Sequence, residues 1–183
     1  MAEMLAAVAI LVVLGSLVVA SLPTAAQVVK RSTYNSNAQV LSTSINTALS
    51  DVLRYSQVYV DAEGQALLSD AFTPYIKPSS TFLDASGAQV ERGYFTNDGV
   101  IVLVSEVGGV AQAQTTPVPA ATGIYTEFEV RDFWLDYRAQ TDAENHFVGN
   151  ARYVGGYTLY TRDGTFAKSY EFTCRPNTGE ILG

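Results

Sequence analysis

The stretch that decides the fold is Glu3-Met4-Leu5-Ala6-Ala7-Val8-Ala9-Ile10-Leu11-Val12-Val13-Leu14-Gly15-Ser16-Leu17-Val18-Val19-Ala20-Ser21-Leu22. Residues 4–22 are uncharged and mostly apolar. At about 1.5 Å per helical residue they are long enough to cross a hydrocarbon core of about 30 Å. Apolar residues occupy every side of this helix, as expected where lipid or other helices surround it. The sequence therefore predicts that residues 1–23 form a helix that lies in a membrane at some stage.

The charges around this stretch differ from those of an ordinary secretory signal. Glu3 directly precedes the apolar run and no basic residue precedes Glu3, whereas a signal peptide begins with a basic region. Lys30 and Arg31 lie just after the span, and the positive-inside rule would place the C-terminal part of the chain in the cytoplasm unless a basic leader upstream of Met1 has been removed. Small residues at 23–26 also resemble a signal cleavage site, so removal of the helix there is an alternative.

Residues 3–15 resemble the mature N-terminus of type IV pilins and type II secretion pseudopilins. In that family a prepilin peptidase removes a basic leader, and a glutamate precedes a long apolar helix that forms the filament core. The resemblance implies that Glu3 pairs with the N-terminal amine of a neighbouring subunit, because a carboxylate inside an apolar bundle is costly unless paired. It also implies helix packing through Leu5, Val8, Leu11, Val12 and Gly15.

The resemblance further implies a structural subunit of a pilus-like or pseudopilus filament, without catalysis or a cofactor. Its partners would be copies of itself or homologous pilin subunits, the prepilin peptidase and the cytoplasmic membrane. A single span would hold the head outside the cell membrane, and assembly would move the chain into a filament at the cell surface or outside the cell. The alternative is a secreted or singly anchored β domain that binds a surface polymer or a protein. Processing before Glu3 or after Ala25 distinguishes the two.

A second helical pattern follows Pro23. Apolar residues recur at spacings of three and four, namely Ala38, Leu41, Ile45, Ala48 and Val52, together with Leu49 and Leu53. We place the polar residues Asn35, Ser36, Ser42, Ser44, Asn46, Ser50 and Asp51 on the opposite face. The pattern predicts an amphipathic continuation over residues 24–56, helical from about Thr24 to Tyr55, with one face buried on a sheet.

Residues 57–183 are expected to form a β-rich head. Turn residues at 97–99 and at 163–164 lie between apolar runs and predict two hairpins. Residues 124–130 alternate with a period of two and predict a strand, followed by a bulge or break near residues 131–133, where the apolar positions change parity. Residues 107–123, rich in Gly, Ala, Gln, Thr and Pro, suggest a loop.

The predicted fold class is α+β, with a long hydrophobic N-terminal helix that packs by its C-terminal half on a mainly antiparallel sheet. Such a sheet needs a cover for its apolar face, and the amphipathic helix supplies one. The formal net charge of −7 offers no basic surface of the kind that nucleic-acid binding requires. We therefore expect no nucleic-acid partner.

The raw materials for catalysis are few. His146 is the only histidine and Cys174 the only cysteine, so no internal disulfide and no cysteine-built metal site can form. We interpret Asp142, Glu144 and Asn145, before His146, as a solvated acidic loop, since EF-hand spacing is lacking. On an extended strand Asp132 and Asp136 would lie about 13 Å apart, too far for a glycosidase pair. We expect Trp134 and Cys174 to be packing residues.

Overall fold

A computed structural model describes residues 2–83, 87–107, 110–117, 126–139, 151–177 and 181–182. These residues form one helix and nine strands, and they confirm the predicted α+β class. The chain divides into two compact units, residues 1–37 and residues 38–183. The elements are α1 (Ala2–Arg54), β1 (Gln57–Tyr59), β2 (Ile76–Lys77), β3 (Arg92–Asn97), β4 (Ile101–Val107), β5 (Val110–Pro117), β6 (Phe128–Arg138), β7 (Arg152–Thr161), β8 (Ala167–Cys174) and β9 (Ile181–Leu182).

Helix α1 belongs to both units. The composition of its first part explains why that part is helical. Ala and Leu are strong helix formers, and a helix satisfies its backbone N–H and C=O groups internally, as apolar surroundings require. The hydroxyls of Ser16 and Ser21 donate to the carbonyls of Val13 and Val18, each at 2.8 Å. Pro23 lies inside α1, and the helix continues on both sides of it.

The second half of α1 buries an apolar stripe in the head. Its buried residues are Ala38, Leu41, Ser42, Ile45, Leu49, Val52 and Leu53. The predicted stripe is thus confirmed except at Ala48, which is only partly buried. The placement of Ser42 on the polar face is wrong, since this side chain is only 2% exposed. Ser42 follows Ala38 by four residues and precedes Ile45 by three, which puts it on the same helical face. Its hydroxyl is satisfied by the carbonyl of Gln39 at 2.9 Å.

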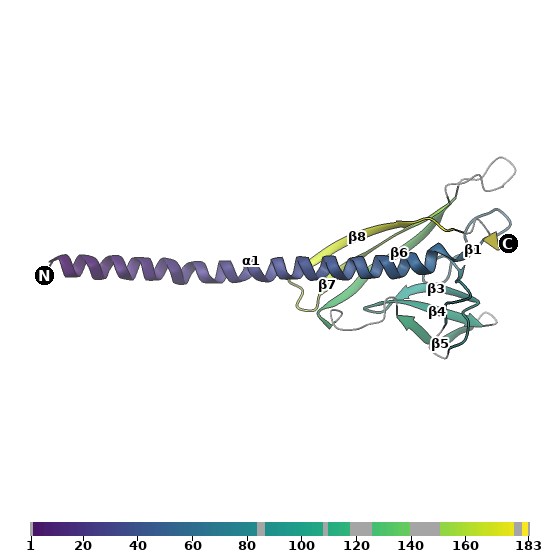
Figure 1. Ribbon diagram of the computed structural model, residues 1–183, viewed down its shortest axis with the longest axis horizontal. Coiled ribbons are helices and arrows are strands. Elements are labelled where there is room, and N and C mark those ends of the chain that lie inside the picture. Colours follow the sequence, from purple (N-terminus) through teal and green to yellow (C-terminus); the bar gives the residue numbers. More distant parts are fainter. Residues whose placement is uncertain are drawn as a thin grey trace. The chain divides into compact units, whose positions relative to one another are not determined.

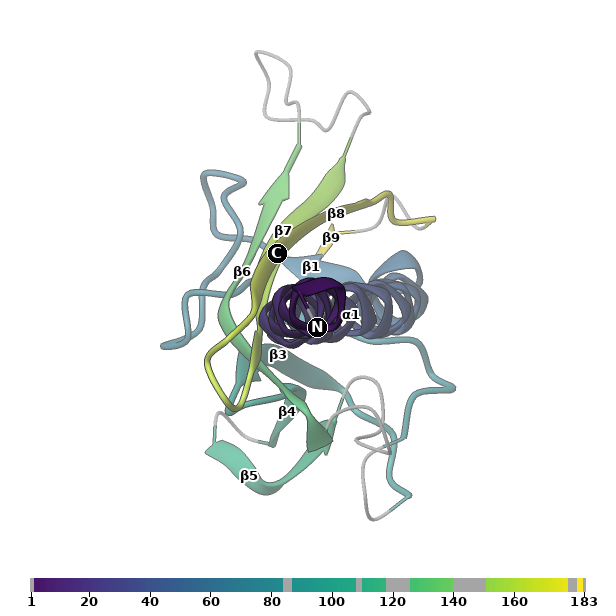
Figure 2. The same cartoon turned by 90° about the vertical axis from the view of Figure 1, so that its left-hand side faces the viewer.

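The strands form two sheets. One has the order β5-β4-β3-β2-β1-β9 and the other the order β6-β7-β8, and every pair is antiparallel except β1 with β9. Both predicted hairpins are confirmed as β3–β4 and β7–β8, with Gly99 and Gly164 in the left-handed conformation that their turns need. Within the head, β8 lies on one side of the second half of α1 and β3–β5 lie on the other (Figures 1 and 2).

Two strand boundaries differ from the predictions. Residues 110–117 form β5 rather than part of a loop, because the outer edge of β4 offers unpaired backbone groups that a neighbouring segment satisfies whatever its composition. Residues 118–123 lie outside the described part of the chain. The strand predicted from Ile124 begins at Phe128, with Thr126 and Glu127 in a turn; Ile124 and Tyr125 lie outside the described residues.

The predicted bulge in β6 is confirmed. The β6–β7 register shifts between Arg131 and Trp134, and Asp132 has a φ of 55°. Before the bulge Phe128 and Val130 are buried, and after it Leu135 is buried at 3% exposure. One extra residue thus keeps apolar side chains on the core face despite their change of parity.

Candidate assembly surface

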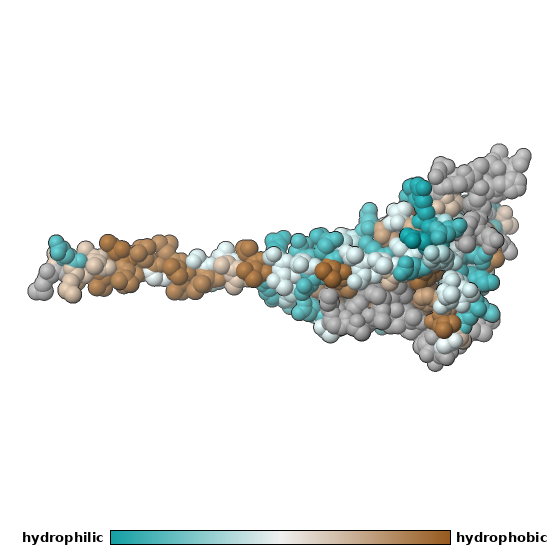
Figure 3. All heavy atoms as spheres, viewed as in Figure 1, coloured by the Kyte–Doolittle hydropathy of each residue, from teal (hydrophilic) through white to brown (hydrophobic). Residues whose placement is uncertain are grey.

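The first part of α1 carries a large apolar surface. Twelve large apolar side chains between residues 4 and 22 are 57–80% exposed. They are Met4, Leu5, Val8, Ile10, Leu11, Val12, Val13, Leu14, Leu17, Val18, Val19 and Leu22. Figure 3 shows this band as an almost continuous brown surface. Removing it from water would be worth on the order of 15 kcal/mol, so this surface needs lipid or protein around it.

The residues predicted to pack against neighbouring helices share one broad face of this segment. Each of Leu5, Val8, Leu11, Val12 and Gly15 lies three or four residues from another member of the set, and all are exposed. A Cβ atom added to Gly15 would meet nothing within 4 Å. Gly15 therefore fills no packing role within the chain itself, and its missing side chain leaves room for another backbone to approach closely.

Glu3 lies in the first turn of α1. A carboxylate there interacts favourably with the positive end of the helix dipole. The next charged residue is Lys30, so residues 4–29 are an uncharged segment of about 39 Å at helical rise. By length and composition α1 can cross a membrane.

In the head, a polar seam fixes α1 to β7. The hydroxyl of Tyr157 lies 3.1 Å from the carbonyl oxygen of Ser42 and 3.0 Å from Oδ1 of Asn46, and these two acceptors share its single proton. The hydroxyls of Tyr153 and Ser56 are 3.0 Å apart. Burial raises the pKa of Tyr153 well above its usual range. The sequence did not reveal this seam, because its members lie about a hundred residues apart and form no local pattern.

Cys174 is confirmed as a packing residue of β8, with 5% of its surface exposed. Its Sγ faces the carbonyl oxygen of Ser50 at 3.8 Å. Burial raises the pKa of the thiol, which favours the unreactive protonated form. Trp134 is 40% exposed, and its indole lies over Gly156, where an added Cβ would be 2.7 Å from Nε1.

An aromatic and charged cluster lies on β1, β3 and β4 and just before β2, and it was also missed by the sequence analysis. The guanidinium of Arg92 lies 3.9 Å from the ring centroid of Tyr75 and 5.3 Å from that of Tyr59. Glu106 accepts a hydrogen bond from the Tyr75 hydroxyl at 3.1 Å, and its other oxygen is 3.8 Å from Nε of Arg92. Because the carboxylate is engaged by both neighbours, the cluster has the features of a structural network rather than of a general base.

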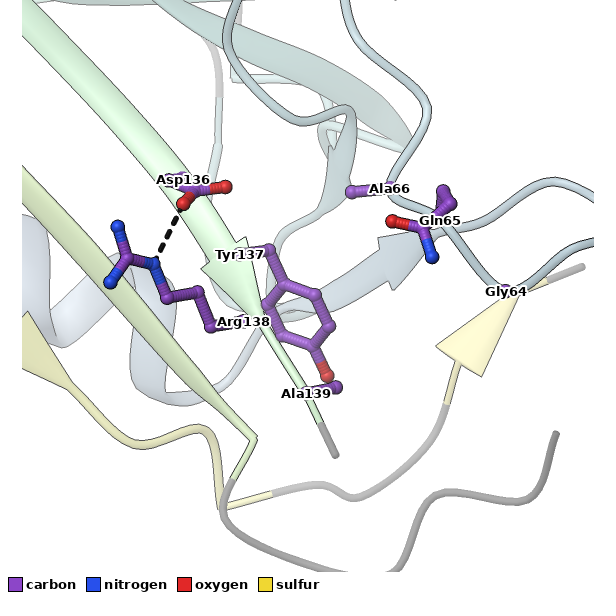
Figure 4. A pocket seen from close by; sticks show the side chains of 7 residues that line it. All are labelled: Gly64, Gln65, Ala66, Asp136, Tyr137, Arg138 and Ala139. Atoms are coloured by element: carbon purple, nitrogen blue, oxygen red, sulfur yellow. Dashed lines mark hydrogen bonds and ion pairs between the residues drawn. The ribbon is translucent and has the colours of Figure 1, made fainter. Parts of the chain in front are cut away.

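A cavity of about 300 Å³ lies between residues 64–66 and residues 136–139 (Figure 4). Arg138 reaches back along β6 to Asp136, with Nε 2.9 Å from the carboxylate, while Tyr137 projects from the other side of the strand. Tyr137 packs on Tyr153, with ring centroids 5.0 Å apart. Asp136 is thus held by a neighbouring cation.

The described residues contain no group of three or more His, Cys, Asp or Glu side chains that could hold a metal ion. Asp132 is within 3.5 Å of the Tyr160 hydroxyl. The acidic loop at 142–146, with His146, lies outside the described residues, so its interpretation stays a prediction. Among the described residues, the strongest candidate for a functional surface is therefore the exposed apolar surface of residues 4–22 of α1.

No family model, curated protein or solved structure matches this chain.

Proposed function

We propose that this chain is a structural subunit of a type IV pilus-like or pseudopilus filament. In this proposal α1 anchors the chain in the cytoplasmic membrane with the head outside, and residues 1–23 later enter the core of a filament. The partners are other copies of the chain or homologous subunits. The chain performs no catalysis and needs no cofactor.

One observation carries the proposal: a single helix combines an exposed apolar part with a part that belongs to the core of the head. The large side chains of residues 4–22 are all more than half exposed, whereas Ile45 and Leu49 are fully buried. Lipid covers such a surface before assembly, and other helices of the same kind cover it afterwards without exposure of apolar area to water. A helix bundle needs no pocket or catalytic group in the head.

Glu3 supplies the specificity in this scheme. Its carboxylate would be costly inside an apolar bundle unless a positive group meets it, and an N-terminal amine of a neighbour provides that charge. Subunits that are out of register would leave Glu3 unpaired. The packing face of Leu5, Val8, Leu11, Val12 and Gly15 then sets how closely neighbouring helices approach.

The first experiment determines the native N-terminus of the membrane-associated protein by mass spectrometry, in cells with and without the prepilin peptidase. The proposal predicts processing shortly before Glu3 that depends on the peptidase. Cleavage near Ala25 would remove the apolar helix, contradict the proposal and favour a secreted β domain that binds a surface polymer or a protein.

The second experiment compares Glu3→Gln with Glu171→Gln, which removes an exposed acid from β8. Filaments sheared from cells are quantified by immunoblot and seen by electron microscopy, and the membrane-bound pool is measured in parallel. We expect Glu3→Gln to reduce filaments at least tenfold, on the order of 1.4 kcal/mol per subunit contact, with the membrane pool preserved. Equal filament yields for the two variants would show that Glu3 does not pair in the assembly.

A further inference from the structure

The segment around the apolar helix is positively charged, although the chain as a whole is negatively charged. Residues 4–50 contain Lys30 and Arg31 and no Asp or Glu, so this segment carries a charge of +2 in a protein with a formal net charge of −7. The nearest acid beyond them in the sequence is Asp51, about 30 Å away at helical rise. Positive charge is therefore concentrated at one level of α1.

The distance along the helix from Glu3 to these basic residues matches the thickness of a membrane. Lys30 follows Glu3 by 27 residues, which is about 40 Å of helix. A bilayer with its headgroup regions is about 40–45 Å thick. With Glu3 near one surface, Lys30 and Arg31 reach the headgroups of the other. The apolar residues 4–22 then lie in the hydrocarbon core of about 30 Å.

A tyrosine lies close to these two basic residues. Tyr34 lies one turn after Lys30, and the Lys30 Nζ is 5.3 Å from the centroid of its ring. Tyrosine is enriched at membrane surfaces because its ring is apolar and its hydroxyl is polar. Arg31 lies beside Lys30 on the adjacent face and is exposed. Its planar guanidinium can donate two parallel hydrogen bonds to one phosphate group.

We propose that Lys30, Arg31 and Tyr34 form an interfacial band that binds the phosphate of anionic phospholipids on the side of the membrane where the head lies. The inference rests on the membrane placement in the proposed function and adds a lipid class to it. Anionic lipids are preferred over zwitterionic ones because the latter carry a cation that offsets the attraction of the phosphate. Each basic side chain near such a surface contributes a preference of roughly fivefold.

The band also sets the depth of the helix. Deeper insertion would carry Lys30 and Arg31 into hydrocarbon, where charged side chains are costly, and outward displacement would separate them from the phosphates. The subunit is thus held at one level before it leaves the membrane. Salt weakens this attraction, because charges at the surface are screened within roughly 8 Å at physiological ionic strength.

The test uses the full-length chain in nanodiscs of phosphatidylcholine and phosphatidylglycerol. The protein is released into a mild detergent, and native mass spectrometry gives the ratio of the two lipids retained on it. Lys30→Gln/Arg31→Gln is compared with Arg162→Gln/Arg175→Gln, which removes two charges from exposed positions of the head. The unmodified protein and the head variant should retain phosphatidylglycerol with a preference of roughly 25-fold, and the Lys30→Gln/Arg31→Gln variant should lose this preference.

Equal retention by the two double variants would overturn the inference. So would loss of the retained lipid on addition of inorganic phosphate, since this would indicate a site for free phosphate rather than for a lipid. Flotation of the nanodiscs reports separately on the proposed function. A chain that fails to stay in the discs would refute the membrane placement itself, whereas a chain that stays without lipid preference would refute only the interfacial band.

Discussion

Replacement of Ile45 by Ala tests whether the second half of α1 is part of the core of the head. Ile45 is fully buried, whereas Val40 on the same helix is 52% exposed and provides a matched control. Truncation of a buried isoleucine to alanine costs about 2–5 kcal/mol, because apolar contacts are lost and a cavity is left. We expect about 3 kcal/mol for Ile45→Ala and less than about 0.5 kcal/mol for Val40→Ala.

The assay is urea unfolding of the intact chain in mild detergent, followed by the fluorescence of Trp134, the only tryptophan and a residue of β6. With a denaturant slope of about 2 kcal/mol per molar urea, Ile45→Ala should lower the midpoint by about 1.5 M. Val40→Ala should leave it almost unchanged. Similar midpoints for the two variants would show that the buried stripe does not support the head, and would refute the assignment of residues 38–54 to its core.

Three further predictions concern other positions. Gly155→Ala should destabilise the head by about 1–3 kcal/mol, because the new Cβ would lie 2.6 Å from the Phe172 ring and 2.9 Å from the Trp134 carbonyl oxygen; an unchanged urea midpoint would contradict that packing. Gly15→Ile should leave the same midpoint unchanged, because a Cβ there meets nothing within 4 Å, but should reduce sheared filaments if neighbouring helices approach at this face. Because burial raises the pKa of Tyr153 above 10.0, its contribution to stability is complete below pH 10 and is lost as the pH rises above that value. Tyr153→Phe should therefore lessen the drop in the urea midpoint between about pH 10 and pH 12.

The hydrophobic helix and the two hairpins were predictable because their signals are local. An unbroken apolar run has few alternatives to a helix in apolar surroundings, and the turns at Gly99 and Gly164 need residues that accept a positive φ. The bulge near Asp132 was predictable for a related reason. A change of parity in an amphipathic strand requires an extra residue if the apolar side chains are to stay on one face.

Strand β5 could not be predicted, because its partner rather than its own composition decides its conformation. Ser42 was misplaced for a different reason: its small polar side chain suggested exposure, although its spacing from Ala38 and Ile45 places it in the buried stripe. The seam between Tyr157 and α1 joins residues more than a hundred positions apart. No periodicity in the sequence records such a contact, because the sheet brings the residues together only after it has packed on the helix.

The sequence by itself determined the apolar helix of residues 4–22, the buried stripe on its continuation and the positive charge at Lys30 and Arg31, because these depend only on residue type and helical periodicity. Only the tertiary structure decided that β1–β5 with β9 and β6–β8 form two separate sheets, and that Tyr153 and Tyr157 fasten β7 to α1. These features depend on which distant segments satisfy one another's backbone groups and fill one another's volume, and that choice is made by the packed chain as a whole.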